Sequence, residues 1–199
     1  MPSVLDPQTA LIVVVPEAEP VVGAIRARFD PSAALGVPAH VTLLHPFMAP
    51  AMVDAAVRGR LESIAAATTS FDYRLAAIHR FPGTLYLTPE PAARFVALTQ
   101  ALVTTFPAWL PYGGRHPAVI PHLTVAQADP SQLDAIESEL RAAMGRDAVA
   151  ARCTEIVLIE NASGRWRTMH AFSLRGTSTA STADPHITST VDHRPIKGR

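Results

Sequence analysis

The chain has 199 residues, 48% of them hydrophobic, which is enough to bury a substantial core and excludes a mostly disordered protein. Lysine plus arginine and aspartate plus glutamate number 17 each, so the net positive charge of proteins that bind nucleic acid nonspecifically is absent. The single cysteine, Cys153, excludes an intramolecular disulfide, and its place in an apparent strand predicts a core thiol.

The first half of the chain predicts alternating strands and helices. An apolar run at about residues 10–15 predicts a buried strand, because it is shorter than the roughly 20 residues of a membrane span and lacks the basic region of a signal peptide. We therefore expect a cytoplasmic protein. Apolar residues at helical spacing predict one helix before and one after a strand that begins at His40, and a third strand is expected over residues 71–79. The helical positions are Val22, Ile25 and Phe29, then Val53, Val57, Leu61 and Ile64.

The second half repeats this layout. A turn at Pro82-Gly83 predicts a hairpin between the third strand and a strand over residues 84–88. A helix, a strand that begins at His122, and a second helix follow. The pattern is again β-α-β-α-β, with one additional strand. The expected helices cover about residues 95–106 and 133–144, with Asp129 as N-cap of the second, and the last strands cover 155–160 and 169–174.

Two segments stand apart from this alternation. The loop of residues 107–117 carries Trp109, Tyr112, Arg115 and His116, and it is either a substrate-facing flap or a surface connector. From residue 177 to 199 the chain is polar and without periodicity, which predicts a disordered tail.

Two histidine-any-threonine motifs lie in strand-like apolar runs. One pairs His40 with Thr42, and the other pairs His122 with Thr124. Because side chains alternate along a strand, each histidine shares a face with its threonine while the residues between them can point into a core. Each motif alone is weak, since roughly one match is expected by chance. Both, however, occupy the middle strand of their half, and two chance matches have no reason to occupy equivalent positions.

A third copy of the motif, His186 with Thr188, lies in the polar tail. A strand with no core to bury cannot hold a catalytic pair in place, so we interpret this copy as a chance match.

With these motifs, the chain resembles the 2H phosphoesterase superfamily, which includes the bacterial 2′-5′ RNA ligases, also called RNA 2′,3′-cyclic phosphodiesterases. The resemblance covers about residues 10–174. It depends on the two motifs, 82 residues apart, on residues 80–83 followed by 85–87, and on Pro121 before the second motif.

The resemblance implies a bilobal α+β fold, in which two pseudo-twofold-related β-α-β-α-β units with antiparallel-rich sheets line one central cleft. We expect one domain over residues 1–176, with lobes of about 1–82 and 83–176. The implied activity is metal-independent and cofactor-independent phosphodiesterase chemistry on an RNA terminus or a small cyclic nucleotide. A monomer with no membrane partner is expected.

The side-chain chemistry agrees with this activity. A histidine titrates near pH 6.5, so at neutral pH one imidazole of a pair can accept a proton while the other donates one. The hydroxyls of Thr42 and Thr124 can donate hydrogen bonds to the phosphate oxygens. In the assignment that the resemblance implies, His40 is the proton donor and His122 the acceptor.

Several other side chains have two possible interpretations. Phe81, Tyr86 and Trp166 are either surfaces on which a nucleobase stacks or ordinary core aromatics. Arg165 and Arg167 either meet phosphate or form a solvated edge, and His45 is expected to be structural. No metal site is expected, because His79, His116 and His170 lack ligand spacing with a carboxylate or a second histidine.

Two further functions compete with the hydrolase. A nucleotide-binding module that kept the cleft without turnover is one, although it would not require both proton-transfer groups. A metal-dependent hydrolase is the other, and chelation with EDTA separates it from the metal-free mechanism.

Overall fold

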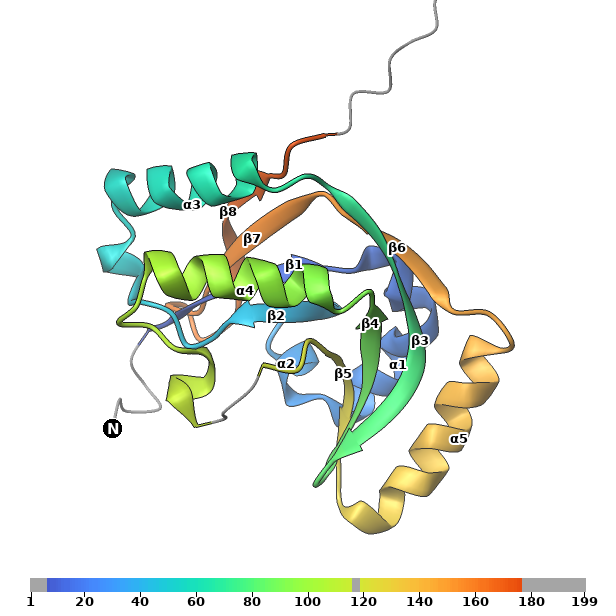
Figure 1. The fold of residues 1–199 in the computed structure, drawn as a ribbon. Coiled ribbons are helices and arrows are strands. Elements are labelled where there is room, and N and C mark those ends of the chain that lie inside the picture. Colours follow the sequence, from blue (N-terminus) through green and yellow to red (C-terminus); the bar gives the residue numbers. More distant parts are fainter. Residues whose placement is uncertain (1–6, 116–118, 177–199) are drawn as a thin grey trace, which may run out of the picture.

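The computed structural model describes residues 7–115 and 119–176. Two four-stranded antiparallel sheets form its centre, with helices on their outer faces (Figure 1). The predicted tail, with its third motif, and His116 lie outside the described residues. The strands are β1 (Thr9–Val14), β2 (His40–Leu44), β3 (Phe71–Phe81), β4 (Thr84–Glu90), β5 (Leu123–Gln127), β6 (Val149–Cys153), β7 (Glu155–Glu160) and β8 (Arg167–Ser173). The α-helices are α1 (Glu19–Phe29), α2 (Pro31–Ala34), α3 (Ala55–Ala67), α4 (Ala93–Thr105) and α5 (Leu133–Met144).

The two sheets combine strands from both halves of the chain. One has the order β2-β1-β7-β8 and the other β5-β4-β3-β6. The last strands, β7 and β8, therefore complete the sheet that the first two begin, and β3 lies in the sheet of the later strands (Figure 1). The sheets thus do not coincide with lobes of residues 1–82 and 83–176. The α+β class with two curled antiparallel sheets is as predicted.

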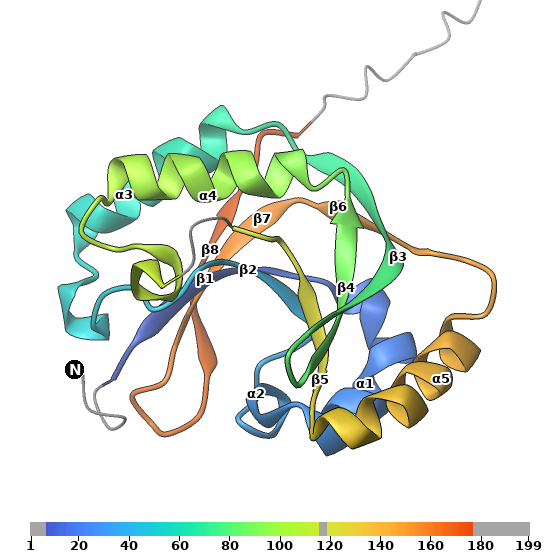
Figure 2. The ribbon, with the colours of Figure 1, turned by 60° about the horizontal axis from the view of Figure 1, so that its bottom comes forward.

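The helices are exchanged in the same way. Helix α1 precedes β2 in the chain but packs against β5, whereas α4 precedes β5 but packs against β2. Helices α3 and α4 lie side by side over one sheet, and α1 and α5 lie side by side over the other (Figure 2). Each strand that carries a motif is therefore backed by the helix that leads into the other one.

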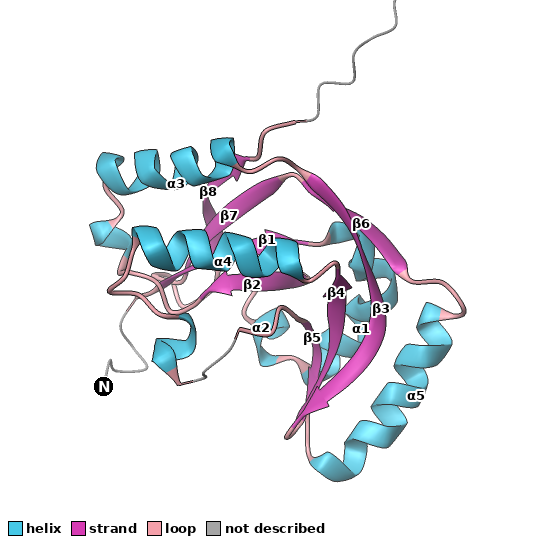
Figure 3. Ribbon diagram, in the orientation of Figure 1, coloured by secondary structure: helices cyan, strands magenta, loops and turns pink. Residues whose placement is uncertain are grey.

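Local sequence signals begin several of these elements. The Asp54 side chain accepts a hydrogen bond from the Val57 amide at 2.8 Å and so begins α3. Asp129 accepts from the Ser131 amide at 2.9 Å, but it caps a short 3-10 turn, Pro130–Gln132, that leads into α5. Gly83 turns the β3-β4 hairpin with a left-handed φ of 73°. Figure 3 shows helices and strands along the chain, with β3 followed directly by β4 and with β6, β7 and β8 in succession at the end.

The core is continuous between the two sheets. One large cluster of buried apolar side chains includes residues of both sheets and of α1, α3, α4 and α5, and a smaller one lies on the other face of β1. Cys153 is fully buried, which confirms the predicted core thiol, and burial raises its pKa to about 12. Among the described residues, no helix is long and apolar enough to cross a bilayer.

Candidate active site

The two motifs meet where the sheets adjoin. Strand β2 is the edge of one sheet, β5 is the edge of the other, and these two edges contact each other. Along both strands burial alternates as predicted: each histidine and threonine is half-buried, and the apolar residues between them, Val41 and Leu123, are fully buried. His40 lies close enough to His122 for the charge of one imidazole to lower the pKa of the other.

Each imidazole is held by a hydrogen bond of the same kind. Nδ1 of His40 is 2.8 Å from the carbonyl oxygen of Pro38, and Nδ1 of His122 is 2.7 Å from that of Ile120. A carbonyl oxygen only accepts, so Nδ1 carries the proton in both rings and Nε2 is left as the titrating atom. The two rings are therefore prepared in one tautomer by equivalent local turns, with the same nitrogen available to a ligand.

Burial makes both imidazoles hard to protonate. Desolvation lowers the pKa of His40 to about 4, against the ordinary 6.5, and it also lowers the pKa of His122. At His40 the positive charge of Arg26 lowers the pKa further, while the bond to Pro38 and the charge of Asp30 oppose the shift. In the free protein at pH 7, both imidazoles are therefore neutral.

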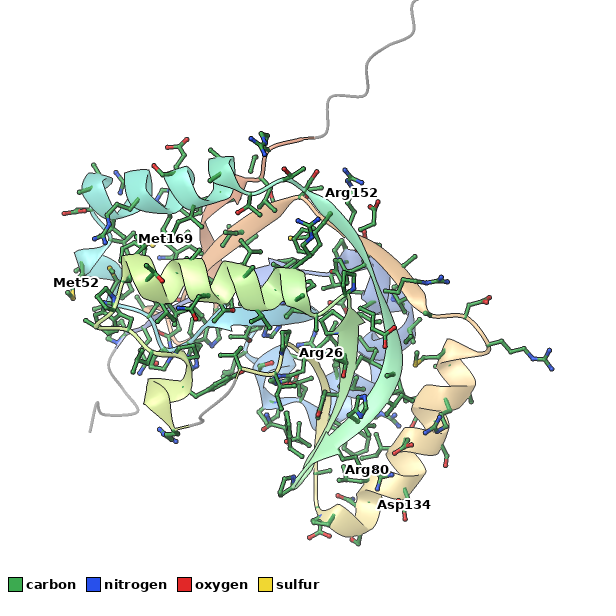
Figure 4. The ribbon with its side chains drawn as sticks, viewed as in Figure 1. Arg26, Met52, Arg80, Asp134, Arg152 and Met169 are labelled. Atoms are coloured by element: carbon green, nitrogen blue, oxygen red, sulfur yellow. The ribbon has the colours of Figure 1, made fainter. Side chains whose placement is uncertain are left out.

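A buried ion-pair network supports the segment that leads into β2. Arg26 of α1 is 2% exposed and pairs with Asp30 at 2.9 Å. Its guanidinium also donates to the carbonyl of Val37 at 3.1 Å, and Glu19 accepts from the amide of Ala39 at 2.6 Å. Figure 4 shows Arg26 inside the fold. The backbone on both sides of Pro38 is thus tied to α1 immediately before His40.

A tyrosine from the loop between α4 and β5 contacts both motifs. The phenol of Tyr112 is hydrogen-bonded to the hydroxyl of Thr42. Its ring is nearly parallel to the His122 imidazole, at 19° and 6.5 Å between centroids. Tyr112 of this loop therefore lies against both motifs.

The predicted aromatic residues divide between two places. Phe81 stacks on Tyr86 with 4.2 Å between centroids, and both rings approach His122 edge-on at 5.3 Å. Trp166 instead lies beside His45, at 5.8 Å and edge to face, next to the end of β2. Phe81 and Tyr86 thus lie beside the histidine of the second motif, and Trp166 lies at the end of β2, the strand of the first motif.

The remaining candidates are distributed as follows. Arg167 pairs with Glu160 of the neighbouring strand, and Arg165 is exposed in the connection between β7 and β8. His79 adjoins Tyr86 at 5.8 Å, and His170 adjoins Phe172 on β8. Within residues 7–115 and 119–176, no three His, Cys, Asp or Glu side chains are grouped to hold a metal ion.

Two residues of this site carried no clear signal in the sequence. Arg26 occurs among polar positions of an amphipathic helix, and nothing local distinguishes a buried arginine from a solvated one. Tyr112 was named only as one of several residues of the loop 107–117, and no pattern distinguished it from the others.

Comparisons with known proteins identify a family and similar folds. A family model described as the 2′-5′ RNA ligase superfamily matches residues 14–165. Among solved structures, TT0787 of Thermus thermophilus superposes with a TM-score of 0.54 at 16% identity, over 85% of this chain and 98% of that one. Escherichia coli LigT, solved with 3′-AMP and with NADP+, gives 0.52 and 0.51 at 16% and 19% identity, over 85% of this chain and 99% of LigT. No curated protein matches the sequence.

Proposed function

The chain belongs to the 2′-5′ RNA ligase superfamily, which confirms its resemblance to the 2H phosphoesterases, and from this membership we propose that it is a metal-independent cyclic phosphodiesterase. Its substrate is the 2′,3′-cyclic phosphate of an RNA end or of a nucleotide. The observation that carries the proposal is the pair of imidazoles of His40 and His122, each fixed by its Nδ1 bond on one of two adjoining edge strands.

The mechanism follows from two proton transfers. His122 accepts a proton from a water molecule as its oxygen attacks phosphorus, and His40 gives a proton to the ribose oxygen as its bond to phosphorus breaks. The net change is addition of one water across one P–O bond. Thr42 and Thr124 hold the nonbridging oxygens, on which negative charge must be stabilised in the transition state.

The lowered pKa values place a condition on this mechanism. Because burial lowers the pKa of His40 to about 4, this donor is neutral in the free protein at pH 7. A phosphate anion between the rings favours the charged imidazole, so the donor takes up its proton as substrate binds. His122 is neutral before binding and can accept a proton directly.

Phe81, which is partly exposed and stacks on the buried Tyr86, supplies a surface for the nucleobase. Every base can stack on an aromatic ring, so this contact does not select a sequence. It therefore suits a substrate that is recognised by its cyclic phosphate. The structures of LigT with 3′-AMP and NADP+ support a small nucleotide or an RNA terminus as the substrate of this chain as well.

The proposal is tested with a panel of 2′,3′-cyclic nucleotides and RNAs that end in a cyclic phosphate, with the product read by ³¹P NMR. We expect hydrolysis that persists in EDTA. His40→Ala and His122→Ala should each lower kcat/KM by about 10²–10⁴-fold, the usual contribution of a positioned proton-transfer group. The double variant should lose much less than the product of the two factors, because both groups act in one transition state.

His170→Ala on β8 is the matched control and should retain full activity. Full activity in both active-site variants would reject the assignment of the site. Complete and metal-reversible loss in EDTA would instead favour the metal-dependent hydrolase. No turnover on any substrate, with nucleotide binding weakened by replacement of His40 or His122, would favour the binding module.

A further inference from the structure

Trp166 lies on the same face of its sheet as the first motif. Ile12 of β1 is the pairing partner of Thr42, and directly opposed residues of antiparallel strands project to the same side of the sheet. Ile12 belongs to the smaller apolar cluster, against which Trp166 packs. Val14, the pairing partner of His40, packs against the same cluster. The Trp166 ring therefore borders the surface from which His40 and Thr42 project.

Two contacts hold Trp166 beside β2. Its amide donates to the carbonyl of Leu35 at 2.9 Å, although β1 and β7 separate β8, which Trp166 precedes, from β2 in the sheet. Its ring meets the His45 imidazole edge to face, with 5.8 Å between centroids. The connection between β7 and β8 thus reaches across the sheet to β2, and Trp166 is partly exposed there.

The site therefore has an aromatic surface on each of its two sheets. Phe81, stacked on Tyr86, lies beside His122 on one sheet, and Trp166 lies beside the strand of His40 on the other. A cyclic mononucleotide has a single base and can stack on only one of these surfaces. An RNA that ends in a cyclic phosphate brings a second base, and successive bases of a strand stack on separate aromatic side chains.

We propose that Trp166 stacks on the base of the nucleotide that precedes the cyclic end, so that the preferred substrate is an RNA end and not a free cyclic nucleotide. This inference depends on the proposed phosphodiesterase function, in which Phe81 receives the base of the terminal nucleotide. Every base can stack on an indole, so this second surface favours a longer chain without selecting its sequence.

The test combines a substrate that lacks one base with a variant that lacks the indole. The substrates are adenylyl-adenosine with a 2′,3′-cyclic phosphate, the same dinucleotide with an abasic first residue, and adenosine 2′,3′-cyclic phosphate. In the parent, kcat/KM for the complete dinucleotide should exceed that for the abasic one by about 5-fold or more, the usual contribution of one stacked base. In Trp166→Leu, which keeps an apolar side chain over the smaller cluster, the two values should be nearly equal. Trp166→Phe keeps a ring and should retain most of the preference.

His170→Ala is the matched control and should keep the full preference. Leu158, the pairing partner of His170, belongs to the large core cluster, so this ring lies on the opposite face of the sheet from Trp166. Because two substrates are compared on one protein, a partial loss of folded protein lowers both rates and leaves their ratio unchanged.

Three results overturn the proposal. The first is an equal kcat/KM for the two dinucleotides in the parent, and the second is a preference that Trp166→Leu leaves unchanged. The third is a loss in Trp166→Leu that is as large for adenosine 2′,3′-cyclic phosphate as for the complete dinucleotide, because Trp166 would then bind the terminal base.

The same comparison separates this inference from the proposed function. If the parent turns over none of the three substrates, the proposed function fails, and the affinity for the corresponding 3′-monophosphates, measured by calorimetry, becomes the readout. The complete dinucleotide should then bind more tightly than the abasic one in the parent and not in Trp166→Leu. Equal affinities in the parent would overturn the role of Trp166. An active parent that shows no preference rejects only the inference.

Discussion

The imidazoles of His40 and His122 share one kind of anchor but have different surroundings. Both donate from Nδ1 to the carbonyl two residues earlier, which gives them the same tautomer. Desolvation lowers the pKa of His40 to about 4, and the charge of the buried Arg26 beside this ring lowers it further. The two histidines are therefore not interchangeable as proton donor and proton acceptor, although their motifs are alike.

The lowered pKa values predict an acid-shifted rate profile. The reaction needs His40 charged and His122 neutral. Both pKa values lie below the ordinary 6.5, so in the free protein a singly protonated pair forms only at acid pH, and the form with the proton on His40 is the minor one because burial lowers the pKa of His40 to about 4. Because kcat/KM reports the free enzyme, its bell should peak below pH 6.5. The kcat profile, which reports the complex, should peak at higher pH because bound phosphate favours the imidazolium.

Rates measured from pH 4 to 9 under both limiting and saturating substrate test this expectation. The His170→Ala variant should give the same two curves, since that ring lies on β8. A kcat/KM maximum at or above pH 7 would contradict the lowered pKa values.

The residues of the two motifs are predictable from the sequence, whereas their partners are not. His40, Thr42, His122 and Thr124 follow from a pattern of period two within apolar runs. The contact of Tyr112 with Thr42 depends on a loop that closes over a strand about 70 positions away, for which no local pattern exists. This contact is determined by how the loop packs in the folded protein.

Among the elements, α1 has a second task besides covering β5. Through Arg26 and Glu19 it holds the carbonyl of Val37 and the amide of Ala39, which flank the residue that anchors His40. The helix therefore backs one motif strand with its apolar face and fixes the entry into the other with its charged side chains.

Replacement of Arg26 should lower the free energy of unfolding far more than replacement of its neighbour Arg28. Arg26→Met leaves Asp30 buried without its partner, which typically destabilises a fold by about 3–5 kcal/mol. Arg28 forms an exposed pair with Glu139, so Arg28→Met should cost less than about 1 kcal/mol. Urea unfolding at pH 7, followed by circular dichroism, measures both.

A double variant, Arg26→Met with Asp30→Asn, should recover part of the loss because it removes the unpaired charge and keeps the oxygen that accepts from Ser32. If Arg26→Met is no less stable than Arg28→Met, the network does not support this segment. Exposed pairs elsewhere, such as Arg80 with Asp134 (Figure 4), serve as a further comparison.

Most elements were predictable because their patterns are local. The helices follow from apolar residues three and four positions apart, and the strands from apolar runs bounded by proline or glycine. The predicted layout gave no range for strand β6, although Cys153 was expected in a strand, because the Val-Ala-Ala-Arg-Cys stretch has little preference for a strand. Its conformation depends on pairing with Phe71–Leu75 of β3, which is far away in the sequence.

At the scale of the whole molecule, the exchange of strands and helices makes the two sheets depend on each other. Strands β7 and β8 need β1, and α1 covers the sheet to which β2 does not belong. The duplicated order of elements could be predicted, but this exchange could not, because it consists entirely of contacts between distant segments.

Neither half of the chain should fold alone. A fragment of residues 83–176 retains β7 but loses β1, its partner over Thr9–Ile12, and loses β3 from the centre of the other sheet. We expect poor dispersion in its proton NMR spectrum and no cooperative unfolding transition. The fragment of residues 1–176 is the control and should unfold in one transition. A cooperatively folded 83–176 fragment would support lobes that follow the sequence halves.

The central position of β1 also has a consequence for the order of synthesis. Its six residues are almost all buried, and one of its edges pairs only with β7, which leaves the ribosome some 140 residues later. Until then the nascent chain carries an apolar strand with an open edge, the feature by which one polypeptide joins another. Slow translation or crowding of polysomes should therefore favour aggregation through Thr9–Val14. This aggregation would occur before the site has folded.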